Sequence, residues 1–228
     1  MSLKDWAGYK NLRDINDEEQ EPYVLPIIIR LEKDENFKPS HEEAQLAVGY
    51  AITKLFDSEI VMPDGEWNES FTKWLNGRIR KVSRRARGSE WEAVKSLPHI
   101  YTSYGKAEII ILKPHPNFEP PAEIKKLQIS GIELAKENRT GNSNNILGLK
   151  FTVNPEINMS TGKTLAQVGH AVQLAIFNST PETVELWVEQ KTPINHCGWN
   201  EYTSWTAEIH DAGFTEIPAG SLTAKSKL

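Results

Sequence analysis

A buried strand followed closely by a capped helix is the feature that most limits the folds open to this chain. Residues 24–31 (VLPIIIRL) form an apolar, β-branched run, which predicts a strand that is buried on both faces. Ser40 and Glu43 then have the spacing of a capping box, and we expect a helix from there to about residue 56.

This strand–helix unit occurs a second time. The dipeptide Ala-Gln at residues 44–45 recurs at residues 166–167, and the same offset places residues 27–31 on residues 149–153. The connections between strand and helix therefore have nearly equal lengths in both places. We interpret this as an internal duplication. The alternative is that any two strand–helix units look alike.

The remaining elements favour an α/β fold. We expect a mixed β-sheet with helices on both faces, built from two related halves. Further predicted elements are a helix from residue 67, a short helix from 89, a strand at 107–112, a helix at 120–134, a strand at 147–153, helices at 162–177 and from 180, and a strand at 215–217. The expected organisation is a flexible arm at 1–22, a first half at 23–135, a linker at 136–145 and a second half at 146–228.

Composition excludes several classes of protein. The net charge of −5 means that any contact with nucleic acid must come from a local basic surface. Cys197 is the only cysteine, so neither an internal disulfide nor a cysteine-rich zinc site is possible, and His196 beside it lacks partners at zinc spacing. We expect no metal and no cofactor. Residues 1–10 lack the apolar core of a signal peptide, and no segment approaches the ~20 apolar residues of a membrane span. A cytoplasmic location is therefore expected.

Polar residues mark one face of the helix at 162–177. Lys163, Gln167 and His170 are spaced i, i+4 and i+7, which places them on the same side. Lys163 lies in the first turn, where its ammonium and the helix dipole together favour an anion or a developing oxyanion. The alternative is a solvated lysine and a core histidine on an ordinary amphipathic helix.

A second polar segment lies near the C-terminus. Asp211 and Thr215 bracket a turn in which Gly213 is free to adopt positive φ, so the two side chains can point to one place. Gly220 and Ser221 form another turn, whose amides and hydroxyl can hold a phosphate or a water. The alternative is a plain β-turn in which the aspartate caps its own backbone.

Together the two segments resemble the type 2 peptidyl-tRNA hydrolase family. The family pattern is a strand, a helix with Met-x-x-Gly-Lys-x-x-x-Gln-x-x-His-Ala, and then Asp-Ala-Gly-x-Thr-(Gln/Glu)-Ile followed by Gly-Ser/Thr. The match covers residues 147–177 and 208–224. The resemblance implies that the active site contains Lys163, His170, Asp211 and Thr215, and that supporting positions are Gly162, Gln167, Gly213, Glu216 and Ser221.

The chain departs from the family pattern at three basic positions. Thr161, Asn154 and Phe214 stand where the family usually has a lysine and two arginines. Residues 178–208 also lack the usual strand and long helix. The first half has the family's order of elements without its chemistry, because His41 and Val48 align with the lysine and histidine. This layout resembles a two-part bacterial form of the family with a degenerate N-terminal repeat.

Residues 77–88 (GRIRKVSRRARG) carry six positive charges and no acid. We expect a helix that docks through an apolar stripe of Ile79, Val82 and Ala86. A solvated face is the usual meaning of such a run. Its purely basic character in an acidic chain instead favours RNA binding, because arginine forks bind phosphate bidentately. The residues expected to bind RNA are Arg78, Arg80, Lys81, Arg84, Arg85 and Arg87.

The expected function is hydrolysis of the peptidyl-tRNA ester, with tRNA as the partner and no membrane. Lys163 would stabilise the oxyanion, Asp211 and Thr215 would hold and deprotonate the attacking water, and His170 would position the substrate end or shuttle a proton. The rival hypothesis is a non-catalytic RNA-binding or regulatory protein that keeps the fold. The repeat also leaves open a homodimer or an internal pseudo-dimer.

Overall fold

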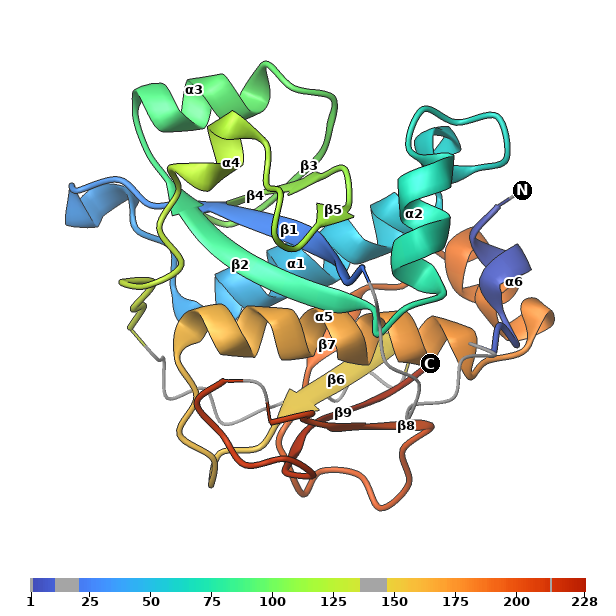
Figure 1. The fold of residues 1–228 in the computed structure, drawn as a ribbon. Helices are drawn as coiled ribbons and strands as arrows, with labels where there is room; N and C mark the ends of the chain where they lie inside the picture. Colours follow the sequence, from blue (N-terminus) through green and yellow to red (C-terminus); the bar gives the residue numbers. More distant parts are fainter. Residues whose placement is uncertain (1, 11–20, 136–146, 214) are drawn as a thin grey trace.

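The computed structural model describes residues 2–10, 21–135, 147–213 and 215–228, and these form two mixed β-sheets with helices packed between and over them (Figure 1). In the first sheet, the strands lie in the order β2-β1-β4-β3, and β5 pairs with one end of β1. β1 is parallel to β2 and antiparallel to β4, which is antiparallel to β3. The strand bounds are β1 (Tyr23–Arg30), β2 (Arg80–Ala86), β3 (His99–Tyr104), β4 (Ala107–Leu112) and β5 (His115–Pro116).

The second sheet has the order β7-β6-β9-β8. β6 is parallel to β7, and the β6–β9 and β8–β9 pairs are antiparallel. Apart from β5, each sheet thus places its strands in the order second, first, fourth, third, with matching directions. The strand bounds are β6 (Leu149–Val153), β7 (Ile194–His196), β8 (Ala207–His210) and β9 (Leu222–Lys227). The fold is α/β with mixed strand directions, as expected, but the strands are divided between two sheets rather than joined in one.

Two long helices fill the layer between the sheets (Figure 1). α1 (His41–Phe56) packs on β3 and β4 and also reaches β7 of the second sheet. α5 (Thr161–Phe177) packs on β6, β8 and β9 and also reaches β2 of the first sheet. The two helices also pack on each other. Their contact with both sheets builds one large apolar core.

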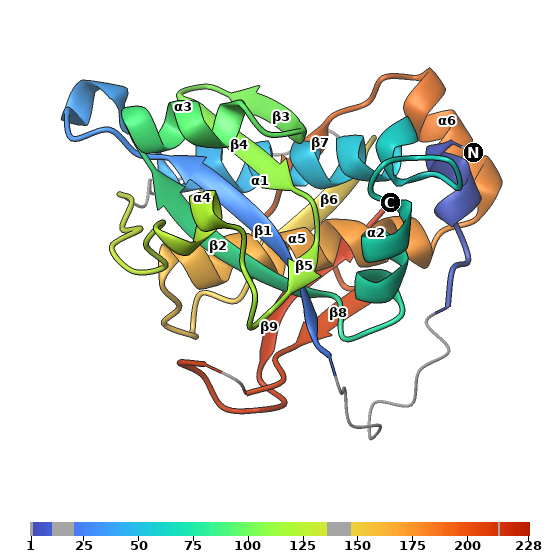
Figure 2. The ribbon, with the colours of Figure 1, turned by 45° about the horizontal axis from the view of Figure 1, so that its top comes forward.

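The other face of the first sheet is covered by α3 (Ser89–Lys95) and α4 (Ala122–Lys125) (Figure 2). Side chains alternate along a strand, so Ile27 and Ile29 of β1 join the core around α1 and α5, while Ile28 joins a second core under Trp91 of α3. This is why β1 is apolar at nearly every position: both of its faces are covered.

Short helices complete the molecule: η1 (Leu3–Trp6), η2 (Glu35–Phe37), η3 (Glu59–Val61), α2 (Asn68–Leu75) and α6 (Pro181–Glu189). Residues 2–10 are not the flexible arm that the sequence predicts. Leu3 and Trp6 are buried, and the Trp6 indole donates a hydrogen bond to the Phe56 carbonyl at 2.8 Å and contacts the Phe177 ring. The expected linker at 136–145 lies outside the described residues. No described helix combines the length and the apolar composition that crossing a membrane requires.

The basic segment at 77–88 is wrongly predicted as a helix: most of it is strand β2. In parallel register with β1, Lys81 pairs with Leu25 and faces the α5 layer, whereas Arg84 pairs with Ile28 and faces the α4 layer. Buried side chains of β2 include the polar residues Lys81 and Ser83. The sequence of this segment therefore lacks the alternation of apolar and polar residues that predicts a strand. Tertiary pairing decides its conformation against its helix propensity.

Three other predictions also need correction. The helix expected at 120–134 is reduced to the single turn of α4. Residues 215–217 are a bend rather than a strand. The stretch 178–208 contains β7 and the beginning of β8 in addition to α6, so the second half does not lack strands. β7 and β8 were missed because they have only three and four residues.

Candidate active site

The beginning of α5 is tied to the loop that follows β8. Ser160 is the N-cap, and its hydroxyl accepts a hydrogen bond from the Lys163 amide at 3.2 Å. The Ser160 amide in turn donates to Glu216 Oε1 at 2.7 Å. The Glu216 carboxylate thereby fixes the loop against the first turn of the helix, and so sets where Lys163 meets the loop.

Lys163, Asp211 and Thr215 converge as the sequence predicts. Lys163 Nζ lies 2.5 Å from Asp211 Oδ2 and donates to Thr215 Oγ1 at 2.7 Å. The side chains of Lys163 and Asp211 are 14% and 5% exposed, so solvent screens their attraction only weakly. The charge pair is therefore held in one geometry at the floor of a cavity.

Three donors orient the Asp211 carboxylate. Besides Lys163, Gln167 Nε2 donates to Oδ2 at 2.7 Å and the Gly213 amide donates to Oδ1 at 2.8 Å. Gly213 has φ of 78°, as predicted, and an added Cβ would lie 2.7 Å from the Ala219 Cβ. The Thr223 hydroxyl lies 2.9 Å from Gln167 Oε1 and so directs the amide nitrogen of Gln167 towards the aspartate.

Ser221 does not have the expected ligand-facing role. Its hydroxyl donates to the Pro218 carbonyl at 2.7 Å, and its own carbonyl accepts from the Asp211 amide at 2.9 Å. The turn therefore holds the backbone of Asp211 rather than a phosphate. Gly162 does line the cavity, and a Cβ there would lie 3.3 Å from Ile132 Cδ1.

His170 lines the same cavity and contacts the first half of the chain. Its Nδ1 lies 3.1 Å from Nζ of Lys81, which projects from β2. Lys81 also donates to Gln173 Oε1 at 2.6 Å and lies 5.0 Å above the centre of the Trp74 ring. Burial, together with the cations Lys81 and Lys163, holds the pKa of His170 well below its ordinary value. The imidazole is therefore neutral near pH 7.

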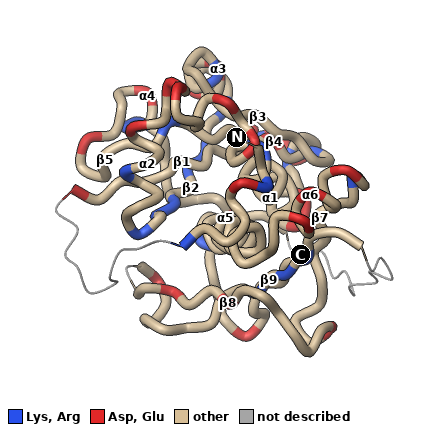
Figure 3. Tube along the Cα trace, turned by 90° about the vertical axis from the view of Figure 1, so that its right-hand side faces the viewer, with Lys and Arg blue, Asp and Glu red and all other residues tan. Residues whose placement is uncertain are grey.

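The cavity has a volume of about 630 Å³ and lies between β2, α5 and the segment that follows β8. All four predicted catalytic residues line it, as do the supporting residues Gly162, Gln167 and Glu216. The first half contributes part of the wall, including Arg78, Arg80, Lys81 and Ser83. The cavity therefore belongs to both halves. Lysine and arginine positions appear in blue around β2 (Figure 3).

The six residues expected to bind RNA are divided by the structure. Arg78, Arg80 and Lys81 reach the cavity. Arg84 and Arg85 instead donate to the carbonyls of Leu127 and Ser130, so they hold the segment after α4 in place. The two outward arginine rows expected of a helix therefore do not form, because basic residues at and before the beginning of β2 reach the cavity and those near its end contact the segment after α4.

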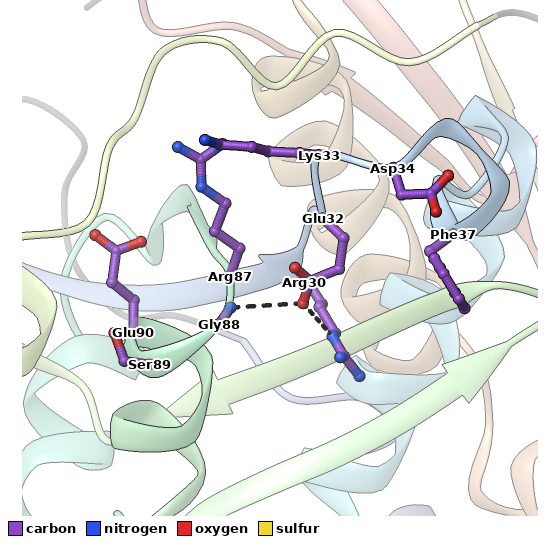
Figure 4. Close-up of a pocket in the computed structure, with 9 residues that line it drawn as sticks. All are labelled: Arg30, Glu32, Lys33, Asp34, Phe37, Arg87, Gly88, Ser89 and Glu90. Atoms are coloured by element: carbon purple, nitrogen blue, oxygen red, sulfur yellow. Dashed lines mark hydrogen bonds and ion pairs between the residues drawn. The ribbon is translucent and has the colours of Figure 1, made fainter.

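Arg87 lines a different hollow of about 770 Å³, together with Lys33 (Figure 4). This hollow is larger, but it contains none of the four predicted catalytic residues. Arg30 in its wall is paired with Glu32 and Glu108 at 2.9 and 2.7 Å. Its charges are largely matched within the wall, so it is a weaker candidate for substrate binding than the cavity around Lys163.

Three residues of the site were not foreseen: Thr223, Gln173 and Trp74. A signal existed for Gln173, which extends the polar row of Lys163, Gln167 and His170 along α5 and is fully buried among apolar residues. Thr223 and Trp74 reach the site only through strand pairing and packing between the halves, which no local pattern reveals. A comparison with protein-family models, with curated proteins and with solved structures finds no match to this chain.

Proposed function

We propose that the protein hydrolyses the ester that links a peptide to the 3′ end of tRNA, in the manner of the type 2 peptidyl-tRNA hydrolases that its motifs resemble. One observation carries the proposal. Two separate segments bring Asp211 and Thr215 within 2.5–2.7 Å of the Lys163 ammonium in the wall of a cavity. A cation, a carboxylate and a hydroxyl in this arrangement suit attack of water on an acyl ester.

The reaction begins with a water molecule held by Thr215 and Asp211. The Thr215 oxygen accepts from Lys163, so its own hydrogen can point to the water oxygen. Asp211 takes a proton as the water oxygen bonds to the ester carbon, and Lys163 stabilises the negative charge on the former carbonyl oxygen. The bond to the ribose 3′ oxygen then breaks, and that oxygen takes the proton from Asp211. The products are a peptide acid and free tRNA.

The tRNA end reaches this site past basic residues of the first half. Arg78 and Arg80 lie in the wall of the cavity, and guanidinium groups there can bind the phosphates next to the terminal ribose. These two arginines stand in for basic residues that the second half lacks at Thr161 and Asn154. RNA binding is therefore assigned to the part of β2 nearest the cavity and not to the whole basic segment.

We also infer that the two halves arose by duplication and form an internal pseudo-dimer. Their sheets have matching strand orders and directions. The two contacts between a helix of one half and a sheet of the other are reciprocal, α1 with β7 and α5 with β2. When the helices are matched by their N-caps, Ser40 and Ser160, Lys163 falls on Glu43 and His170 on Tyr50. This register replaces the match to His41 and Val48 that the Ala-Gln dipeptides suggest.

The test is turnover of an N-acetylated aminoacyl-tRNA by the purified protein. Asp211→Asn preserves the shape of the side chain and removes the base, and it should lower kcat by about 100-fold or more. Asp64→Asn, on an exposed turn, is the matched control and should leave kcat unchanged. Binding of tRNA without any cleavage would refute hydrolysis and favour the non-catalytic RNA-binding protein instead.

A further inference from the structure

A lysine from the first half enters the candidate site of the second half. Lys81 lies on β2, 8% exposed, and its Nζ ends between Gln173 Oε1 at 2.6 Å, His170 Nδ1 at 3.1 Å and the Trp74 ring. No carboxylate within the described residues is recorded as its partner. A buried lysine without a carboxylate is costly to keep, so the position calls for a reason other than stability.

The surroundings of Lys81 fix the direction of its hydrogen bonds. Its three neighbours are an amide oxygen, a ring nitrogen and an aromatic face, and the oxygen and the ring face can only accept hydrogens. An ammonium has three hydrogens and no lone pair, so it can only donate to an imidazole nitrogen. Lys81 therefore donates, and His170 Nδ1 accepts.

The consequence for His170 is a defined tautomer. A neutral imidazole that accepts at Nδ1 carries its hydrogen on Nε2. Among the described residues, no hydrogen-bond partner is recorded for Nε2 of His170, and the ring lines the cavity. The Nε2–H is therefore a donor that the protein leaves for a ligand.

We propose that Lys81 is a positioning residue of the site: it holds His170 as the Nε2–H tautomer, so that the imidazole donates a hydrogen bond to the substrate ester instead of acting as a base. The proposal rests on the hydrolytic function proposed above. It also assigns the first half an essential part in the chemistry, because the residue that orients His170 comes from the other sheet.

The direction of the pKa shift at His170 agrees with a neutral imidazole. Burial and the two nearby lysines lower its pKa well below the ordinary value, and burial lowers the pKa of Lys81 as well. The recorded influences on His170 come from Lys81 of β2 and Lys163 of α5, both cations. Asp211 lines the same cavity, but it is paired with Lys163. His170 is therefore neutral near pH 7.

The test is ¹⁵N NMR of the histidine side chains in the full chain, with the His170 signals assigned by their loss in His170→Gln. In the wild type, Nδ1 should have the shift of an unprotonated ring nitrogen and Nε2 that of a protonated one between pH 6 and 8. Lys81→Met keeps most of the unbranched side chain and removes the donor. The His170 ring should then populate both tautomers.

Lys150→Met is the matched control. Lys150 is also a buried lysine with a pKa lowered by burial, but it lies in β6, outside the cavity, 5.7 Å from the centre of the Tyr202 ring. It should leave the His170 signals unchanged. A wild-type ring that carries its hydrogen on Nδ1, or Lys81→Met spectra identical to the wild type, would overturn the proposal.

Kinetics separate this proposal from the proposed function. Lys81→Met should lower kcat by about tenfold or more, because a wrongly oriented catalytic group costs at least that much. In His170→Gln, whose amide donates regardless of tautomer, the added Lys81→Met change should cost little. If the wild type cleaves no peptidyl-tRNA while the NMR result holds, hydrolysis is refuted and the control of His170 by Lys81 stands. Equal losses in both backgrounds would contradict an action through His170.

Discussion

Replacing Lys163 with alanine tests both the chemistry and the stability of the site. The Lys163 ammonium is the counter-charge of Asp211, and both side chains are largely buried. Without it, the carboxylate keeps two donors, Gln167 Nε2 and the Gly213 amide, but no cation. The variant therefore leaves a buried charge only partly compensated.

Breaking one side of a buried ion pair costs about 3–5 kcal/mol. The two remaining donors and the open cavity place Lys163→Ala at the lower end, about 3 kcal/mol. For a chain of this length each kcal/mol lowers Tm by roughly 2–4 °C, so the expected drop is about 6–12 °C. Turnover should fall by about 100-fold or more, since an oxyanion donor is lost.

Calorimetry and the N-acetyl-aminoacyl-tRNA assay measure the two effects on the same samples. Adding Asp211→Asn to Lys163→Ala removes the uncompensated charge, so Tm should return most of the way to the wild-type value while turnover stays low. A single variant that melts within about 2 °C of the wild type refutes the buried pair. So does a double variant no more stable than Lys163→Ala. Unchanged turnover removes Lys163 from the mechanism.

Three further predictions follow from the same geometry. Arg80→Gln should weaken tRNA binding and make the slope of log affinity against log salt concentration shallower by about 0.7–0.9. Arg84→Gln loses its hydrogen bond to the Leu127 carbonyl, so it should lower Tm and leave that slope unchanged. Residues 146–228 expressed alone should not fold cooperatively, because α5 would lose its contacts with α1 and β2; a stable, active fragment would contradict this. His170 has a lowered pKa in the folded state, so the unfolded chain binds more protons and stability should fall as pH drops below about 6.5, by up to about 1.4 kcal/mol per unit. Denaturant titrations at pH 7.5 and 5.5 should show a smaller loss in His170→Gln than in the wild type.

The sequence predicts those parts of the fold whose signals are local. The run at residues 24–31 is apolar because both faces of β1 are covered, and the capping box of Ser40 and Glu43 forms as expected. These two features depend on neighbours within a few residues, which a single sequence displays. Helix periodicity and the glycine turn orient Lys163 and Asp211 separately, but the two residues lie far apart in the chain, and the resemblance to one family is what predicted their contact.

The features that escaped prediction depend on partners distant in the chain. Residues 80–86 form a strand because β1 lies beside them, although their composition suits a helix. Trp6 is buried because α1 and α5 end near it, and nothing in the polar segment around it indicates this. The second wall of the cavity was missed for the same reason: it is made by packing one half against the other.

Two glycines show how that packing makes the halves unequal. Gly49 in α1 and Gly169 in α5 are each the ninth residue of their helix, and each lies where the helix meets the other half's sheet. Gly49 faces Ile194 of β7, which pairs with Leu149, whereas Gly169 faces Lys81 of β2, which pairs with Leu25. At Gly49 the helix thus packs on an apolar side chain of the other sheet. At Gly169 the matching position of the other sheet is a lysine that reaches the candidate site. A Cβ at residue 169 would lie 2.9 Å from Lys81 Cδ, so glycine there leaves the lysine room to reach His170. Under the proposed duplication and function, divergence at this pair of positions lets one half hold the catalytic residues and the other orient them.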